Sequence, residues 1–282
     1  MDNSNSILIN RFFTRNTFRE ILESGESSTY ATVIKRYVKD GETLTNQECI
    51  STIYQFLKNE YQNEYYYKNT LLNKLLFGVH NPHTTTALTE VPIGKSKADF
   101  ILINGKAVVY EIKTDLDNFD RLDRQIEDYY KAFSRVAVVT SERNYNDLKM
   151  KLKDSPVGMY VLTDRGTISE RKKAIEDLSR LSPTTIFKIL RKEEYEAIIS
   201  HEYGFLPNVS QFEYYKKCKS LFEALPIEKI YGLFLPMLKK RVKIEVDEIK
   251  SVPYPLKFLI YFSGYRKSDY SKLMSFLKEQ EG

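Results

Sequence analysis

The sequence has few of the residues that support disulfide or zinc chemistry. Among its 282 residues there are two cysteines, Cys49 and Cys218, and three histidines. Two cysteines so far apart are too few for a disulfide framework or a zinc site. The His80–His83 segment is interrupted by Pro82 and has no third nitrogen or sulfur ligand nearby, so we interpret it as a loop.

The sequence also lacks a long apolar run and a strong charge of either sign. No segment approaches the roughly 18 apolar residues of a membrane-spanning helix, and no signal peptide is evident. We therefore expect a cytoplasmic protein with no membrane partner. The formal net charge of +5 is compatible with a polyanion partner but too small to demonstrate one. With 42% hydrophobic and 29% charged residues, the chain can bury a core in one large domain or two smaller ones.

The N-terminal part of the chain is predicted to be helical after a weakly patterned start. We treat residues 1–44 as an extension. The sequence TNQE from Thr45 to Glu48 forms a capping box, and apolar residues follow it at helical spacing. A second helix is predicted from about Glu60 to Phe77.

From Thr86 the apolar period becomes that of strands. The runs TALTEVPI, DFILI and KAVVYEI predict three strands, and Asn104-Gly105 between the last two is a hairpin signal. A helix near residues 122–133 precedes RVAVVT, a strand covered on both faces whose crossover connection predicts parallel pairing. GMYVLT and the segment after DRGT predict two more strands. Residues 45–180 therefore form a predicted α/β domain.

Beyond about Ser182 the pattern is helical, and Ser182-Pro183 suits a cap and first turn. We assign residues 181–282 to an all-helical C-terminal domain that selects substrate or a protein partner. Its densest basic run, KKRVK from Lys239 to Lys243, is either a nucleic-acid contact or a solvated helix end.

The residues that could take part in catalysis or metal binding lie at the strand ends. Asp99 stands at the head of one apolar run, and Glu111-Ile112-Lys113 ends the next. Carboxylate oxygens are ligands that Mg²⁺ prefers. Glu111 and Lys113 project from one strand face because side chains alternate with period two. The lysine is therefore placed to position or deprotonate a water and to offset charge that builds on a phosphate.

Whether the two acids meet depends on the hairpin register. A two-residue loop would send Glu111 to the face opposite Asp99. A three-residue loop, Ile103–Gly105, with a left-handed glycine, would pair Asp99 with Val109 and leave the acids as diagonal neighbours, about 7–8 Å apart on one face. We predict the second arrangement.

These residues resemble the motif of the PD-(D/E)XK, or restriction-endonuclease-like, nuclease superfamily. Asp99, Glu111 and Lys113 match it position by position. The resemblance implies that the two acids and the main-chain carbonyl of Ile112 bind the metal, and that the lysine serves the catalytic water. It also implies a restriction-endonuclease-like core, in which helices flank a mixed central sheet.

A second motif lies on the following helix. Gln125 and Tyr129 are similar to the Gln-x-x-x-Tyr element of the RecB-like branch, which lies beside the active centre and contacts substrate. Arg121 falls on the same helical stripe, so we assign all three to substrate binding. The other acids of this helix, Asp128 among them, are expected at cap or surface positions. The run YEIKTDLDNFDRLDRQIEDY is also similar to a largely uncharacterised bacterial and phage family within the superfamily.

The sequence departs from the family pattern in two places. Ala98, rather than proline, precedes Asp99. The additional metal-binding acid that the family usually takes from its first helix or strand is ambiguous here. Glu90 is our first choice for this acid, and Glu64 and Glu60 are the alternatives.

These observations favour a Mg²⁺-dependent nuclease that acts on DNA rather than RNA, with Mn²⁺ able to replace Mg²⁺. A second hypothesis is a nuclease-derived module that binds nucleic acid or a protein without cutting. A third is a component of a phage-defence or mobile-element system that is active only when a partner delivers substrate. The presence of all three motif residues favours an enzyme.

Overall fold

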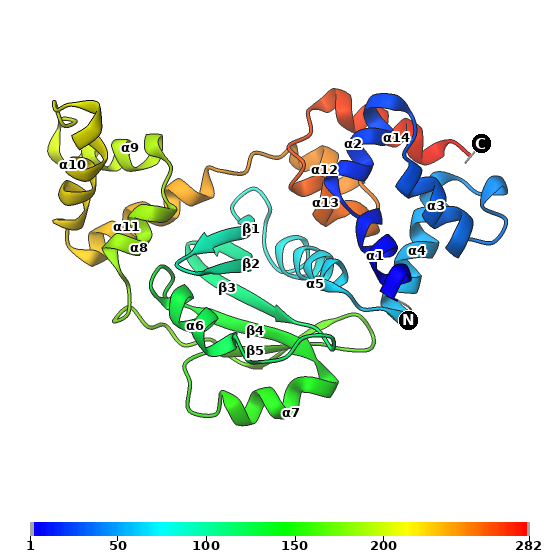
Figure 1. Cartoon of the computed structure of the whole chain (residues 1–282), viewed down its shortest axis with the longest axis horizontal. Coiled ribbons are helices and arrows are strands. Elements are labelled where there is room, and N and C mark those ends of the chain that lie inside the picture. Colours follow the sequence, from blue (N-terminus) through cyan, green and yellow to red (C-terminus); the bar gives the residue numbers. More distant parts are fainter. Residues whose placement is uncertain (1–2, 281–282) are drawn as a thin grey trace. The chain divides into compact units, whose positions relative to one another are not determined.

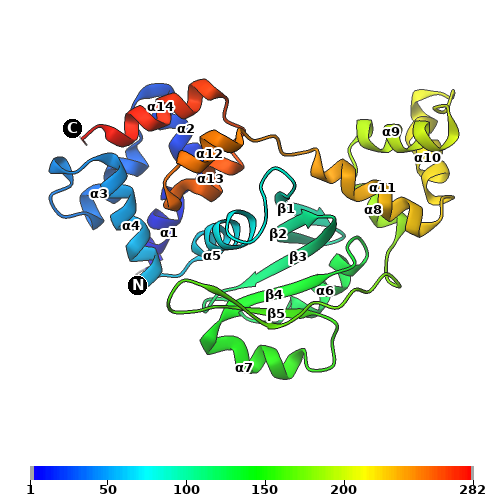
Figure 2. The same cartoon turned by 180° about the vertical axis from the view of Figure 1, so that it is seen from behind.

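The computed structural model describes residues 3–280. Contacts between residues divide the chain into two units, which are described separately (Figures 1 and 2). The helical unit combines the residues up to 83, residues 164–168 and the residues from 243 onward. The sheet unit contains residues 84–163 and 169–242. This division cuts across the three predicted segments, whose status as domains stays a prediction.

The helical unit draws its elements from both ends of the chain. They are α1 (Asn3–Phe12), α2 (Arg15–Ser24), α3 (Ser28–Tyr37), the short helix η1 (Gly41–Thr43), α4 (Asn46–Glu60), α5 (Glu64–Leu71), the π-helix η2 (Leu72–Phe77), α12 (Val246–Ser251), η3 (Tyr254–Leu256), α13 (Lys257–Tyr261) and α14 (Lys267–Lys278).

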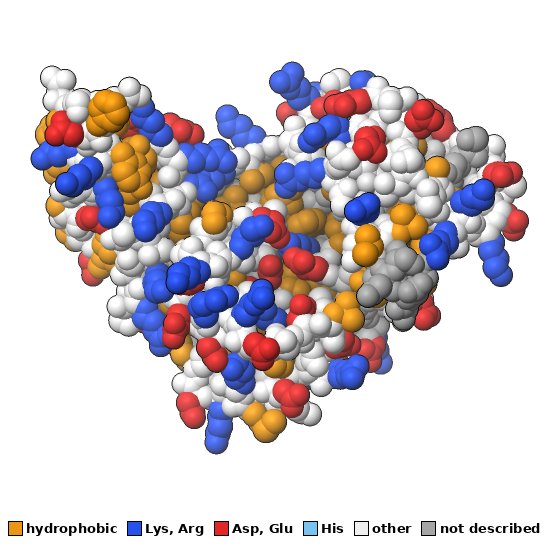
Figure 3. Space-filling model, in the orientation of Figure 1, with side chains coloured by type: hydrophobic (Ala, Val, Ile, Leu, Met, Phe, Trp, Pro, Cys, Tyr) orange, Lys and Arg blue, Asp and Glu red, His pale blue; other side chains and the backbone are white. Residues whose placement is uncertain are grey.

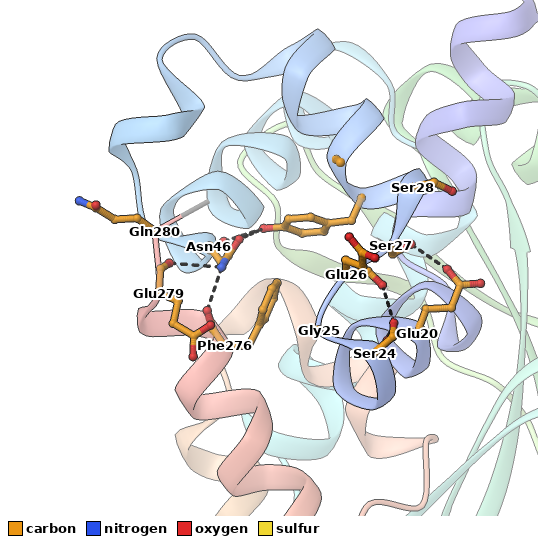
Figure 4. Close-up of a pocket in the computed structure, with 12 residues that line it drawn as sticks. Glu20, Ser24, Gly25, Glu26, Ser27, Ser28, Asn46, Phe276, Glu279 and Gln280 are labelled. Atoms are coloured by element: carbon orange, nitrogen blue, oxygen red, sulfur yellow. Dashed lines mark hydrogen bonds between the residues drawn. The ribbon is translucent and has the colours of Figure 1, made fainter. Parts of the chain in front are cut away.

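The start of α4 confirms the predicted capping box and joins the two ends of the chain. Thr45 and Glu48 cap each other, and the Glu48 carboxylate accepts from the Thr45 N–H at 2.8 Å. Next to them, Asn46 Nδ2 donates to the carbonyl oxygens of Phe276 and Glu279 at 3.0 and 3.2 Å (Figure 4). These contacts border a polar hollow of about 650 Å³. Side chain-to-backbone bonds therefore hold α14 against the beginning of α4.

A buried amide links three further segments of the helical unit. Asn69 on α5 is fully buried. Its Nδ2 donates to the Tyr54 hydroxyl at 2.8 Å and to the Tyr254 carbonyl at 3.0 Å, and its Oδ1 accepts from the Phe258 N–H at 3.0 Å. Since a buried polar group without partners costs about 1–3 kcal/mol, this side chain ties α4, α5 and the η3–α13 segment together.

The sheet unit is built on a six-stranded mixed sheet, which confirms the predicted α/β class. Its strands, in the same order in space and in the chain, are β1 (Thr86–Ile93), β2 (Ser96–Asn104), β3 (Lys106–Lys113), β4 (Val136–Ser141), β5 (Gly158–Leu162) and β6 (Ile168–Lys172). The first three are antiparallel, whereas β3, β4 and β5 run parallel. The parallel pairing of β3 with β4 confirms the prediction made from the crossover helix between them.

Two helices of the sheet unit lie between strands in the chain, and four follow the last strand. They are α6 (Leu122–Tyr130), α7 (Glu142–Lys151), α8 (Pro183–Ile189), α9 (Lys192–Tyr203), α10 (Gln211–Glu223) and α11 (Ile227–Lys239). α6 packs on β2 and β4, and α7 packs on β4 and β5. One apolar cluster contains Ile101 and Val109 of the strands together with Ile126 of α6. Asp99 lies two residues from Ile101, and Glu111 lies two residues from Val109. Because side chains alternate along a strand, both acids lie on the sheet face that α6 covers.

The register of the β2–β3 hairpin differs from the prediction by two residues. Val109 pairs with Ile101 rather than with Asp99, and Ile103 pairs with Ala107. The reversal is centred on Gly105, whose φ of 67° is the left-handed conformation that glycine adopts without strain, so the strands extend almost to the tip. An even shift leaves every side chain on its predicted face.

The C-terminal region is helical, as predicted, but its helices divide between the two units. α8 begins with Ser182 as N-cap, followed by Pro183. A nucleic-acid contact by the predicted basic run stays a prediction, but Arg241 within it is largely buried rather than solvated. Its guanidinium lies 2.5 Å from the Glu194 carboxylate, and the two side chains are 11% and 10% exposed. Across residues 3–280, every helix is too short or too polar to cross a bilayer.

Candidate active site

Three acids on neighbouring strands lie in a row across the sheet. The pairing on either side of Glu90 sets it opposite Asp99, and the β2–β3 register continued by one residue sets Asp99 opposite Glu111. Carboxylate oxygens of Glu90 and Asp99 lie within 4.8 Å of each other. The row leads from exposed Glu90 through half-buried Asp99 to Glu111, which is 1% exposed.

Glu90 has an unusual backbone conformation. Its φ is 57°, although it lies inside a strand and is not a glycine. Such a conformation is uncommon for a residue with a side chain and is retained where the surroundings enforce it. Next to it, the Thr89 hydroxyl donates to the Asp99 carbonyl at 2.7 Å. The Glu90 carboxylate forms an ion pair with Lys97 at 2.8 Å.

Asp99 is joined directly to the next strand. Its Oδ2 accepts the Ile112 N–H at 2.8 Å. The main chain of Ile112, between the two charged motif residues, therefore lies beside the Asp99 carboxylate. The same bond fixes the orientation of the aspartate relative to β3.

Glu111 and Lys113 form a buried ion pair. The Lys113 ammonium lies 2.9 Å from Glu111 Oε1, and the exposed fractions of the two side chains are 9% and 2%. The two side chains project from one face of β3, as the period of two requires. Since a buried charge is costly without a partner, each side chain depends on the other.

The Gln-x-x-x-Tyr residues of α6 complete this cluster. Gln125 Nε2 donates to Glu111 Oε1, and Gln125 Oε1 accepts from the Lys113 ammonium at 2.9 Å. The Tyr129 hydroxyl reaches Glu111 Oε2 at 2.5 Å and the Lys97 carbonyl at 2.8 Å. Burial, and then the adjacent Glu111 carboxylate, raise the pKa of Tyr129 far above 10, so its hydroxyl stays protonated as a donor.

Arg121 lies at the edge of this arrangement. α6 begins at Leu122, so Arg121 is the N-cap residue and is exposed. Across residues 3–280, no hydrogen bond or ion pair connects its guanidinium to the three acids. Before α6, the Asp117 carboxylate accepts the Thr114 N–H at 2.9 Å. The assignment of Arg121 to substrate binding stays a prediction.

Asp128 has a structural role that the sequence did not suggest. It is 5% exposed, and it accepts the Lys95 N–H at 3.1 Å and the Ser96 hydroxyl at 2.8 Å. A Cβ at Gly94 would lie 2.6 Å from Asp128 Oδ1, so the β1–β2 turn requires glycine there. Burial alone would raise the pKa of Asp128, but the Lys131 ammonium and these donors outweigh it and lower the pKa. The expectation of a surface acid was wrong because the partners are about thirty residues away in the sequence.

The donor set suits a hard divalent cation. Glu90, Asp99 and Glu111 supply carboxylate oxygens on adjacent strands. Mg²⁺ takes oxygen ligands and uses one or two carboxylates together with waters. Glu60 and Glu64, the alternative acids, belong to the helical unit.

Comparison with known proteins identifies the family of the chain. The model of the family described as bacteriophage P4 protein cII matches residues 57–251, more than half of the chain. A curated relative, Protein cII of Enterobacteria phage P4, is 26% identical over 149 residues, which cover 51% of this chain and 54% of that protein. The alignment thus spans about half the length of the relative. No solved structure gives a significant match. The chain belongs to the bacteriophage P4 protein cII family.

Proposed function

We propose that the protein is a metal-dependent nuclease that hydrolyses phosphodiester bonds, with DNA rather than RNA as substrate. The observation that carries the proposal is the row formed by Glu90, Asp99 and Glu111, with Lys113 paired to Glu111 at 2.9 Å. Hard oxygen ligands next to a fixed ammonium are what metal-assisted attack on a phosphate requires.

The topology gives further support. β1, β2 and β3 are antiparallel, α6 follows, and β4 returns parallel to β3. This order agrees with a restriction-endonuclease-like core. Figure 3 shows Lys and Arg side chains gathered over α6, where Arg121 and Arg124 are exposed. Positive side chains on the helix that supplies Gln125 and Tyr129 suit a phosphate backbone.

Mg²⁺ is the proposed cofactor, with Mn²⁺ able to replace it. Asp99 and Glu111 would hold the ion, with Glu90 and the Ile112 carbonyl as further ligands. Bound there, a divalent cation lowers the pKa of water and neutralises charge on the phosphate.

The neighbouring side chains set the orientation and charge of the site. Gln125 and Tyr129 hold both oxygens of Glu111, which fixes the rotamer of the carboxylate. Lys113 carries a positive charge to the same point and is the group that would position the attacking water. Gln125 bridges the glutamate and the lysine, so it couples their positions.

The test compares two isosteric acid-to-amide changes. Asp99→Asn keeps an oxygen for the Ile112 N–H but removes one anionic ligand. Asp120→Asn makes the same charge change on an exposed residue outside the cluster. Linear, circular and single-stranded DNA and RNA are incubated with Mn²⁺ or with EDTA. We expect Mn²⁺-dependent cleavage by the wild type and by Asp120→Asn, and none by Asp99→Asn. Equal cleavage by both variants would reject the assignment.

One observation favours a second candidate function, a catalytically silent module that binds nucleic acid or a protein partner through its C-terminal helices. Glu111 is 1% exposed, and its two oxygens already contact Lys113, Gln125 and Tyr129. The phage origin of the relative is compatible with a role in a phage-defence or mobile-element system. DNA binding without Mn²⁺-dependent cleavage, unchanged in Asp99→Asn, would favour this candidate. Cleavage that begins only when lysate is added would indicate a missing partner.

A further inference from the structure

A hollow of the sheet unit lies at the opposite end of the β2–β3 hairpin from the acids. Its volume is about 410 Å³, within the range of roughly 300–1,000 Å³ of small-molecule sites. The hairpin tip at Gly105 and one face of α11, from Tyr231 to Lys239, form its walls. Six residues separate Asp99 from Gly105 along β2, or about 20 Å at the rise of a strand.

Two residues of α11, Gly232 and Pro236, shape the side of the hollow that this helix forms. An ideal Cβ at Gly232 would meet nothing within 4 Å, so the missing side chain leaves space above the helix. Pro236 lies inside the helix and has no N–H to donate to the Gly232 carbonyl four residues earlier. The Gly232 carbonyl therefore lacks its usual helical donor. Leu235 and Pro236 provide apolar surface beside it.

Polar groups converge at one side of the hollow. The Tyr231 hydroxyl accepts the Ser134 N–H at 3.0 Å and lies 3.1 Å from the Ser134 hydroxyl, which also contacts Glu176 at 3.1 Å. The Glu176 carboxylate is balanced by Arg135 at 3.5 Å. These polar groups have no net charge as a set, and their hydrogen bonds are made to one another.

The rim of the hollow is cationic. Lys106 and Lys239 both line it. Among residues 3–280, neither ammonium has an ion-pair partner. Two such ammonium groups next to an apolar, hydrogen-bonding wall fit a ligand that joins an anion to a flat heterocycle.

We propose that this hollow binds a nucleotide unit, with the base between the hairpin tip and α11 and the phosphate at Lys106 and Lys239. Leu235 and Pro236 provide apolar surface for the face of the base, and the Ser134–Tyr231 pair lies at its edge. The inference goes beyond the proposed cleavage, since it concerns a separate hollow. The unit is supplied either by a free nucleotide or by a single strand, and the experiment distinguishes these sources.

The key variant is Gly232→Leu. Leucine forms helices far better than glycine, and the position has room for a side chain, so the variant is expected to melt no lower than the wild type. Its side chain would nevertheless fill the hollow. Gly232→Ala is the matched control, because it gives most of the helix gain with a single methyl group.

Binding is measured calorimetrically on the full chain in EDTA, where metal-dependent cleavage is off. The probes are deoxyadenosine monophosphate, a short oligodeoxyadenylate and inorganic phosphate alone. We expect Gly232→Leu to weaken nucleotide binding at least about tenfold and Gly232→Ala to change it little. Lys106→Gln and Lys239→Gln are each expected to weaken binding and reduce its salt dependence.

The outcomes separate cleanly. Tighter binding of the oligonucleotide assigns the unit to a strand, and equal or tighter binding of the monophosphate assigns it to a free nucleotide. Phosphate that binds as well as the nucleotide overturns the role of the base. No binding of any probe, or equal binding by wild type and Gly232→Leu, overturns the proposal. Because no metal is present, these results do not depend on whether the acids support cleavage.

Discussion

Removal of the Lys113 ammonium should destabilise the sheet unit. Lys113→Met keeps much of the side-chain volume and removes the charge. Glu111 then remains 1% exposed without its cationic partner. Breaking a buried pair in this way costs about 3–5 kcal/mol.

Remaining contacts place the expected loss at the lower end of that range. Gln125 and Tyr129 still donate to Glu111 after the substitution, so its carboxylate is not left without hydrogen bonds. We therefore expect a loss of about 3 kcal/mol in the free energy of unfolding. For a unit of this size, the loss corresponds to a melting temperature lower by about 6–12 °C.

A double-mutant cycle tests the reasoning. Glu111→Gln combined with Lys113→Met removes both charges, and we expect the double variant to be more stable than Lys113→Met alone. Lys151→Met is the control, since Lys151 contacts Asp123 at 2.7 Å in an exposed pair worth at most about 1 kcal/mol. Urea unfolding followed by circular dichroism measures the free energy of unfolding of the wild type, the two single variants, the double variant and the Lys151→Met control. A loss for Lys113→Met no larger than that for Lys151→Met, or strict additivity in the cycle, would refute a buried, mutually dependent pair.

Three further predictions concern residues outside the candidate site. Asn69→Leu should lower the free energy of unfolding by about 3 kcal/mol, because it leaves several buried donors and acceptors unpaired, and urea titration measures this loss. Arg241→Met should cost about 3–5 kcal/mol through the unpaired Glu194, whereas exposed Lys240→Met should stay within about 0.5 kcal/mol in the same assay. The pKa of Asp128 is lowered from 3.8, so its stabilisation is present above that pH and is lost as the pH falls through the lowered value. The stability gap between wild type and Asp128→Asn should therefore stay the same from pH 6 to about pH 5 and shrink as the pH falls below 3.8, and a gap that stays constant there would contradict the assignment.

Local patterns were sufficient for most elements of the fold. The TNQE run fixed the start of α4 because Thr45 and Glu48 satisfy each other's backbone donors. Strand periodicity and the crossover helix predicted a mixed sheet, since a parallel pair requires such a connection. The hairpin register was misjudged by two residues because Gly105 serves equally well at several positions of a tight turn.

Contacts between distant segments could not be predicted. In the helical unit, Asn46 donates hydrogen bonds to the carbonyls of Phe276 and Glu279, and no local sequence pattern in either segment predicts this contact. Arg241 looked like a surface cation within a basic run. It pairs with Glu194, 47 residues earlier in the chain, and no local pattern indicates that contact.

The residues of the candidate site were predictable, but their surroundings were not. Motif spacing selected Asp99, Glu111 and Lys113, and alternation placed the last two on one face. The burial of that pair depends on α6, which supplies Gln125 and Tyr129 from the facing layer. The left-handed backbone at Glu90 has no sequence signal, since glutamate rarely adopts it.

The central claim is that the acids of β1, β2 and β3 form one divalent-cation site, and calorimetric titration of Mn²⁺ into wild type, Asp99→Asn and Asp120→Asn tests it most directly. We expect wild type and Asp120→Asn to bind Mn²⁺ with the same affinity, and Asp99→Asn to bind at least about tenfold more weakly. Binding by Asp99→Asn as tight as that of the wild type, or no Mn²⁺ binding by the wild type, would contradict the account.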